Sequence, residues 1–264
     1  MAFLFGAIIG SFLNVVIYRF HTGRSLAGHS HCLSCGTRLR WYELFPVVSY
    51  LVLRGRCRTC SSYIPPRYML VEAATGCLFM LGAYHATNVT MLGVEWVLAA
   101  LLVVIVVYDL NHLIIPDEFV ILLISVAAFV LGREWWLKPD SETVVWDIGA
   151  ALLASGFFAA LWLVSKGRWL GLGDAKLLFP LALLVGAGAV FSLVVFSFWV
   201  GALISLLIIG WQWLANRGKE RLVSSAPGLT IKSEVPFAPF MILAFFLVHY
   251  GNYDVLSLIL YVYL

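Results

Sequence analysis

Charged side chains are scarce in this sequence. Of its 264 residues only 12% are Asp, Glu, Lys or Arg and 62% are hydrophobic, whereas roughly a quarter of an ordinary soluble domain is charged. This scarcity argues against a water-soluble globule. The formal net charge of +3 is too small to indicate a nucleic-acid partner, and we expect none.

Several common catalytic motifs are also missing. The sequence has no Gly-x-Ser-x-Gly, no His-Glu-x-x-His and no phosphate-binding glycine loop, so serine, zinc-peptidase and nucleotide-dependent chemistry have no motif to support them. The first charged side chain is that of Arg19. Because the opening segment lacks the basic region of a secretory signal, we expect it to be retained as a first transmembrane span.

Long apolar runs fill most of the chain, and several reach the roughly 20 residues that a helix needs to cross the hydrocarbon core. Bounded by charges, proline and glycine, these runs predict an all-α polytopic protein of the lipid bilayer with about eight transmembrane helices. The predicted spans are 2–19, 69–86, 94–110, 118–132, 146–165, 175–190, 191–214 and 237–262. The least distinct division is the one at Gly186 to Gly188.

The positions of Lys and Arg predict the orientation, since these residues gather at the cytoplasmic ends of spans. With eight spans, fifteen of them fall on one face, in the segments 19–68, 166–176 and 215–236. The opposite face has only Arg133 and Lys138. We therefore expect both termini outside and the large loop after the first span in the cytoplasm.

This loop contains two Cys-x-x-Cys pairs, at a spacing close to that of four-cysteine zinc sites. The cysteines are Cys32, Cys35, Cys57 and Cys60. So short a segment cannot bury a large core and needs an additional source of stability. We predict a small cytoplasmic domain that is stabilised by structural zinc. A pair of redox dithiols is the alternative. The predicted division is a first span at 1–19, this zinc domain at 20–68 and a helical domain at 69–264. Cys77 is expected to be a buried apolar residue.

Two acidic residues stand out by their positions. Asp109 follows the apolar run 97–107, and Asp174 follows Gly171 and Gly173 at the start of span six. The predicted topology places both carboxyls at cytoplasmic span ends, where acids on different helices can face each other. Such a pair can supply the base and the acid for peptide hydrolysis by an activated water. For each aspartate, a helix cap or an ion pair with Lys or Arg is the structural alternative.

Two glycines precede Asp174, and a second pair of acidic residues follows Pro116. Gly171 and Gly173 permit unusual backbone angles and the close approach of an extended substrate. Asp117 and Glu118 follow Pro116, and this pattern is typical of ordinary helix initiation.

A set of motifs runs along nearly the whole chain. They are Gly10 to Arg19, Ser30-His31-Cys32, Arg54-Gly55-Arg56-Cys57, Tyr68 to Glu72, Asp109 with Ile115-Pro116-Asp117, Gly171 to Lys176, and Pro236-Phe237-Ala238-Pro239-Phe240. Together they resemble the motifs of bacterial type IV prepilin peptidases. The resemblance implies an enzyme of the bacterial inner membrane that removes the leader peptide of prepilins or pseudopilins, after a glycine on the cytoplasmic side. It assigns catalysis to Asp109 and Asp174, supported by Gly171, Gly173 and Lys176.

The same resemblance implies a second activity, in which the new amino terminus is methylated with S-adenosylmethionine. This activity is associated with the cysteine-containing region, and Glu72 is a candidate residue for it by position. The sequence makes no prediction of oligomeric state.

Two other classes of protein remain open. One is a zinc-stabilised membrane scaffold whose aspartates only pair structurally. The other is a proton-coupled transporter, for which intramembrane acids are also expected. A transporter of the inverted-repeat kind should have matching halves, and the cysteine loop has no counterpart in the second half.

Overall fold

The computed structural model describes residues 1–264 except 24, 26–27, 217–235, 256 and 258–264. Within that part of the chain the structure is helical, and its only β pairings are two isolated bridges. The predicted all-α fold is confirmed. The chain divides into two compact units, residues 1–108 and 109–264, and the boundary falls inside helix α4 (Val89–His112).

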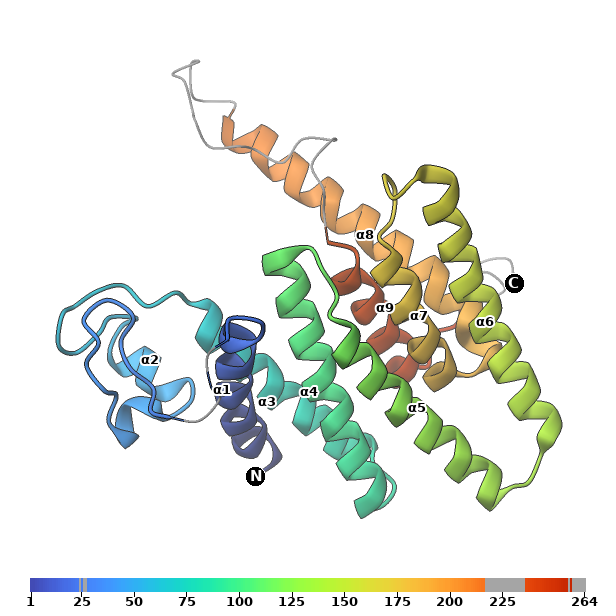
Figure 1. The fold of residues 1–264 in the computed structure, drawn as a ribbon, viewed down its shortest axis with the longest axis horizontal. Helices are drawn as coiled ribbons and strands as arrows, with labels where there is room; N and C mark the ends of the chain where they lie inside the picture. The colour runs from blue at the N-terminus through green and yellow to red at the C-terminus, as the bar shows by residue number, and fades with distance from the viewer. Residues whose placement is uncertain (24, 26–27, 217–235, 256, 258–264) are drawn as a thin grey trace. The chain divides into compact units, whose positions relative to one another are not determined.

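In the first unit, helices α1 (Ala2–Arg19) and α3 (Arg67–His85) lie side by side (Figure 1). Two glycines one helical turn apart make this approach possible, as is common in membrane helix pairs. A Cβ atom on Gly6 would lie 2.6 Å from Phe79 Cβ, and one on Gly10 would lie 2.8 Å from the Cα of Glu72. Ordinary side chains at these positions would force the two helices apart.

The segment between these helices contains little regular structure. It holds a 3-10 helix, η1 (Trp41–Leu44), the short helix α2 (Val48–Val52) and two tight cysteine turns. One bond ties the ends of α1 and α3 together beneath it, since the Asn14 amide donates to the Tyr68 carbonyl at 3.1 Å.

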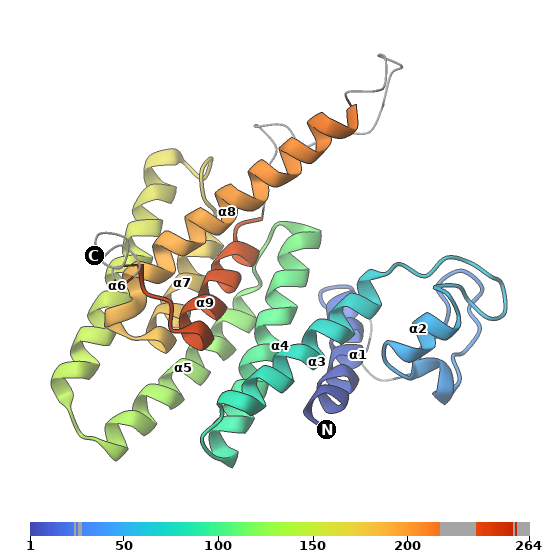
Figure 2. The same cartoon turned by 180° about the vertical axis from the view of Figure 1, so that it is seen from behind.

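Among its described residues, the second unit contains five helices after α4, which pack into a bundle (Figure 2). These are α5 (Asp117–Leu137), α6 (Ser141–Ser165), α7 (Leu172–Val185), α8 (Ala187–Asn216) and α9 (Ala238–Gly251). Helix α7 contacts α5, α6, α8 and α9, and the side chains of Leu177, Leu178 and Leu181 are fully buried. This short helix is therefore surrounded by protein, where van der Waals packing supplies the stabilisation that lipid cannot.

Each predicted span overlaps a helix. Among the described residues, five helices are long and apolar enough to cross a membrane: α1, α4, α5, α6 and the part of α8 up to Leu214. The predicted break in the long apolar run is confirmed, because α7 ends at Val185 and Gly186 has a φ of +75°. The exact number of membrane crossings stays a prediction.

Two boundaries differ from the expected ones. Helix α5 continues to Leu137, so Glu134 lies in a helix and not in an outer loop, and Asp140 then caps α6 by accepting the N–H groups of Glu142 and Thr143. Helix α9 ends at Gly251, because Asn252 adopts a left-handed conformation with a φ of +51°. The remainder of the predicted last span lies partly outside the described residues, as do Arg24, Arg217, Lys219, Arg221 and Lys232.

Candidate active site and metal centre

Asp109 lies one turn before the end of α4, and its side chain is only 5% exposed. The backbone N–H of Ala238, the first residue of α9, donates to its carboxylate. The Oδ2 atom is buried and has no hydrogen-bond partner among the residues that the structure describes. Because buried polar atoms are almost always paired, an unpaired carboxylate oxygen indicates a place where a water or a substrate group binds.

Asp174 is the third residue of α7 and is 7% exposed. Its Oδ2 accepts the N–H of Gly171 at 3.0 Å, so this side chain does serve as a helix cap. The cap occupies only one of its two oxygens, so the other oxygen is left for a second interaction. The cap and the pairing of the two acids are therefore compatible.

Of the two glycines before Asp174, Gly173 serves close packing, and neither has an unusual backbone conformation. Neither has a positive φ, and Gly171 has an ordinary φ of −76°. A Cβ on Gly173 would lie 3.2 Å from the Cβ of Ile115, so the absent side chain lets the start of α7 approach the segment before α5. The expectation of special backbone angles was wrong for both residues.

Lys176 reaches across to the start of α5. Its Nζ atom lies 2.8 and 3.0 Å from the two carboxylate oxygens of Asp117. Asp117 therefore does more than begin a helix, because it also ties α5 to α7 two residues beyond Asp174. The side chains are 44% and 63% exposed, so water weakens the pair.

Two polar groups near the aspartates were not predicted from the sequence. One is the N–H of Ala238, and the other is the Ser155 hydroxyl, which donates to the Ala175 carbonyl at 2.7 Å. The sequence did contain a signal for Ala238. Because Pro236 and Pro239 have no backbone N–H, the N–H groups of Phe237 and Ala238 are the only backbone donors between Pro236 and Pro239. Nothing in the sequence around Ser155 relates it to α7, because the contact is made only by helix packing.

The four predicted cysteines come together in the first unit, and their sulfur atoms all lie within 4.8 Å of one another. The two turns that carry them have the same backbone design. Gly36 and Ser61, each following the second cysteine of its pair, have φ angles of +71° and +58°. Their N–H groups donate to the carbonyls of Cys32 and Cys57, both at 2.9 Å.

The sulfur set suits a metal ion of the kind that thiolates bind. A tetrahedral ion with bonds of about 2.3 Å holds its sulfurs about 3.8 Å apart, and Cys32 Sγ lies 3.9 Å from Cys60 Sγ. The N–H groups of Cys35 and Ser34 donate to the Cys32 sulfur and lower its pKa to about 6. This shift favours the thiolate that metal binding requires.

Two other sequence-predicted residues lie apart from this cluster. Cys77 is exposed on α3 and not buried, because a membrane helix can leave an apolar side chain to lipid. Glu72 lies in α3, where its Oε2 accepts the N–H of Val47 at 2.8 Å. The cysteines and Glu72 belong to the first unit, whereas both aspartates belong to the second.

Apolar helices long enough to cross a bilayer, two buried acids on different helices and a four-thiol cluster together define a polytopic membrane protein with a candidate aspartyl active site. Comparison with known sequences agrees with this class. Residues 4–86 match the Bacterial Peptidase A24 N-terminal domain, and residues 96–206 match the Type IV leader peptidase family.

Several characterised proteins named prepilin leader peptidase/N-methyltransferase are similar to the chain. The protein of Klebsiella pneumoniae is 33% identical over 192 residues, which cover 70% of this chain and 83% of the relative. That of Dichelobacter nodosus is 28% identical over 272 residues, covering 91% and 87%. That of Myxococcus xanthus is 33% identical over 211 residues, covering 78% of this chain but 62% of the relative. No solved structure matches the chain.

The chain therefore belongs to the type IV leader peptidase family, and the predicted family resemblance is confirmed. Its helices and its family together make it an integral protein of the bacterial inner membrane.

Proposed function

We propose that this protein is an intramembrane aspartic endopeptidase that removes the leader peptide of type IV prepilins or pseudopilins, with Asp109 and Asp174 as its catalytic pair. The observation that carries the proposal is the burial of two carboxyls on different helices of the same unit. Asp109 and Asp174 are both buried, and Asp109 Oδ2 has no hydrogen-bond partner among the described residues.

The pair has the chemistry that peptide hydrolysis needs. One ionised carboxylate takes a proton from a water, while the other carboxyl, protonated, donates to the carbonyl oxygen of the scissile bond. The Ala238 N–H donates to Asp109 and the Gly171 N–H donates to Asp174. These bonds fix the orientation of both side chains, which leaves water binding and proton transfer to the remaining oxygens.

The predicted topology places this chemistry at the cytoplasmic face, where the leader of a prepilin is expected to lie. Cleavage after a glycine is the specificity implied by the family. Gly173 and Lys176 support the motif by setting α7 against Ile115 and Asp117, and Gly171 supports it through its N–H bond to Asp174. The transporter and scaffold alternatives are not favoured, since the chain matches leader peptidase sequences over both units.

In the first unit, Cys32, Cys35, Cys57 and Cys60 would hold one Zn²⁺. Four thiolates form a closed shell with no open position, so the ion stabilises residues 20–68 and takes no part in the chemistry. Methylation of the new amino terminus is the second proposed activity, because the relatives are named as N-methyltransferases. S-adenosylmethionine would supply the methyl group.

Replacement of each aspartate by asparagine tests the proposed protease. Asparagine keeps the size of the side chain and an oxygen that accepts the same N–H group, but it neither ionises nor donates as a carboxylic acid. In membranes containing a co-expressed prepilin, Asp109→Asn and Asp174→Asn should each slow leader removal on the order of 10²–10⁴-fold.

Asp147 provides a matched control in the same unit. Its buried carboxylate accepts the Ala187 N–H at 2.7 Å at the start of α8, a bond that asparagine can also accept. Asp147→Asn should therefore leave cleavage near the wild-type rate at equal protein abundance. Full-rate cleavage by either Asp109→Asn or Asp174→Asn would exclude the proposed pair.

A further inference from the structure

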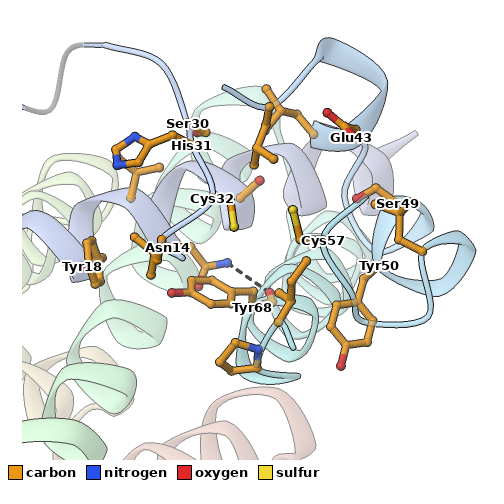
Figure 3. A pocket seen from close by; sticks show the side chains of 18 of the residues that line it. Asn14, Tyr18, Ser30, His31, Cys32, Glu43, Ser49, Tyr50, Cys57 and Tyr68 are labelled. Carbon is orange, nitrogen blue, oxygen red and sulfur yellow. Dashed lines mark hydrogen bonds between the residues drawn. The ribbon is translucent and has the colours of Figure 1, made fainter. Parts of the chain in front are cut away.

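A large cavity opens between the cysteine segment and the ends of α1 and α3. Its volume is about 630 Å³, within the range of small-molecule sites. Figure 3 shows Cys32 and Cys57 on its wall, with Asn14 and Tyr68 beside them. These two cysteines are buried, whereas Cys35 and Cys60 are exposed. The proposed metal centre therefore also shapes one wall of the cavity.

The chemistry of the lining is mixed in charge and rich in aromatic rings. The residues that line it include the acidic Glu43 and Glu72 and the basic Arg19 and Arg58. Four tyrosines also line it, Tyr18, Tyr50, Tyr63 and Tyr68. Such a lining suits a ligand that carries a positive charge, a negative charge and a flat ring, because each part finds a complementary group.

Glu72 lies at the end of the cavity that reaches into the helices. It is five residues into α3, about 7.5 Å along the helix axis, and it faces α1, where Gly10 leaves room and Ser11 bonds to its carboxylate. Its bond to the Val47 N–H holds a residue with a φ of +61° just before α2. Glu72 therefore also positions α2, whose Ser49 and Tyr50 line the same cavity.

We propose that this cavity is the methyl-transfer site and binds an adenosyl sulfonium methyl donor, with the Glu72 carboxylate facing the positive centre. The inference rests on the proposed methyltransferase activity and assigns it a place and a charged residue. The donor combines an amino-acid zwitterion, a sulfonium and a purine, which are the three features that the lining suits.

The reaction keeps one positive charge near Glu72 throughout. The lone pair of the new amino terminus forms a bond to the methyl carbon while the carbon–sulfur bond breaks. The bonding electrons leave with sulfur, which becomes a neutral thioether, and the resulting methylammonium releases its proton to solvent. The charge thus passes from sulfur to nitrogen, and a fixed carboxylate stabilises it at both positions.

Binding of two donor analogues to the full-length, metal-loaded protein tests the role of the charge. S-adenosylhomocysteine has a neutral sulfur, whereas sinefungin has a cationic amine in its place. Because glutamine can still accept the Val47 N–H, Glu72→Gln removes the charge and keeps the bond. It should weaken binding of sinefungin by about tenfold, as expected for a partly solvated charge pair, and leave binding of S-adenosylhomocysteine unchanged. Glu72→Ala should weaken both, because α2 loses its anchor.

A second pair of variants in α2 tests the location. Ser49 lines the cavity, whereas Leu51, two residues further, is 61% exposed and lines no part of it. Ser49→Trp should abolish binding of S-adenosylhomocysteine while metal content and leader cleavage persist. Leu51→Trp should bind it as the wild type does.

Mass spectrometry of the processed pilin distinguishes the two levels of the proposal. If the wild type methylates, and neither Ser49→Trp nor Glu72→Gln changes binding of either analogue, the cavity assignment is wrong and the methyltransferase stands. If the wild type binds neither analogue and leaves the amino terminus unmethylated, both the activity and its site are overturned.

Discussion

The cysteine cluster and the aspartate pair are assembled in different ways. The four sulfurs come from two tight turns, residues 32–37 and 57–62, each closed by its own backbone hydrogen bonds. The two aspartates are 65 residues apart in the sequence, and their placement depends on the helices packed around α7. The positions of the cysteines are therefore set by short local turns, whereas the positions of the two aspartates are set by the packing of several helices.

Because the two sites are built differently, we expect the cysteine cluster to affect the folding of its unit and the aspartates to affect the reaction. The cysteine segment is small and its order depends on the proposed metal, so removal of a ligand should unfold it. The aspartates are buried in a packed helical bundle, and the role proposed for them is catalytic. Substitutions in the two units should therefore change different properties.

The largest expected effect on structure is loss of the metal. Cys57→Ser combined with Cys60→Ser should lower metal content from one ion per chain to none. The segment 20–68 should then unfold, because structural zinc contributes on the order of 10–16 kcal/mol of apparent binding energy in small domains. Elemental analysis and limited proteolysis measure the two results. Cys77→Ser is the control and should retain the metal. A segment that stays folded and protease-resistant without metal would show that zinc does not stabilise it.

A smaller effect is expected where α1 meets α3. A Cβ on Gly10 would lie 2.8 Å from a backbone atom, the Cα of Glu72, which no side-chain rotation can relieve. Gly10→Ala should lower the free energy of unfolding by about 1–3 kcal/mol, measured by thermal unfolding in detergent.

Gly149 in α6 is the matched helix position, since no atom lies within 4 Å of its added Cβ. Gly149→Ala should be neutral or stabilising by up to about 1 kcal/mol. Equal losses of stability in the two variants would contradict the close helix contact at Gly10.

The smallest effect is expected at the ion pair of Lys176 with Asp117. Both side chains are substantially exposed, so their coupling should be about 0.2–1 kcal/mol. Leader-cleavage rates of Lys176→Met, Asp117→Asn and the double variant measure it in a cycle. A coupling of several kcal/mol would place Lys176 in the chemistry itself and not only in the packing of α5 on α7.

Much of the fold could be predicted because long apolar runs in the sequence indicate membrane helices. Every predicted span overlaps a helix, and the glycine near residue 186 correctly marked a break. The ends were harder to predict. Trp135 and Trp136 extend α5 beyond its apolar core, and a left-handed Asn252 stops α9 although apolar residues follow. Hydropathy does not register either feature.

The two sites also differ in how far they could be predicted from the sequence. Spacing alone was enough to predict the cluster of Cys32, Cys35, Cys57 and Cys60, because its turns are local. The apolar runs were enough to predict that Asp109 lies near the end of its helix and Asp174 near the start of its own, whereas their shared membrane level stays a prediction. The Ala238 N–H and the cavity at Glu72 were not predictable, because both arise from segments that are distant in sequence and meet only in the packed structure.

The central claim is that Asp109 and Asp174 act as one unit, and a double-mutant cycle tests it most directly. The measurement is the initial rate of leader cleavage in proteoliposomes for Asp109→Asn, Asp174→Asn and the double variant. If the two carboxyls share one water and one proton, the double variant should be no slower than the slower single variant. Losses that multiply, or substantial cleavage by either single variant, would contradict the claim.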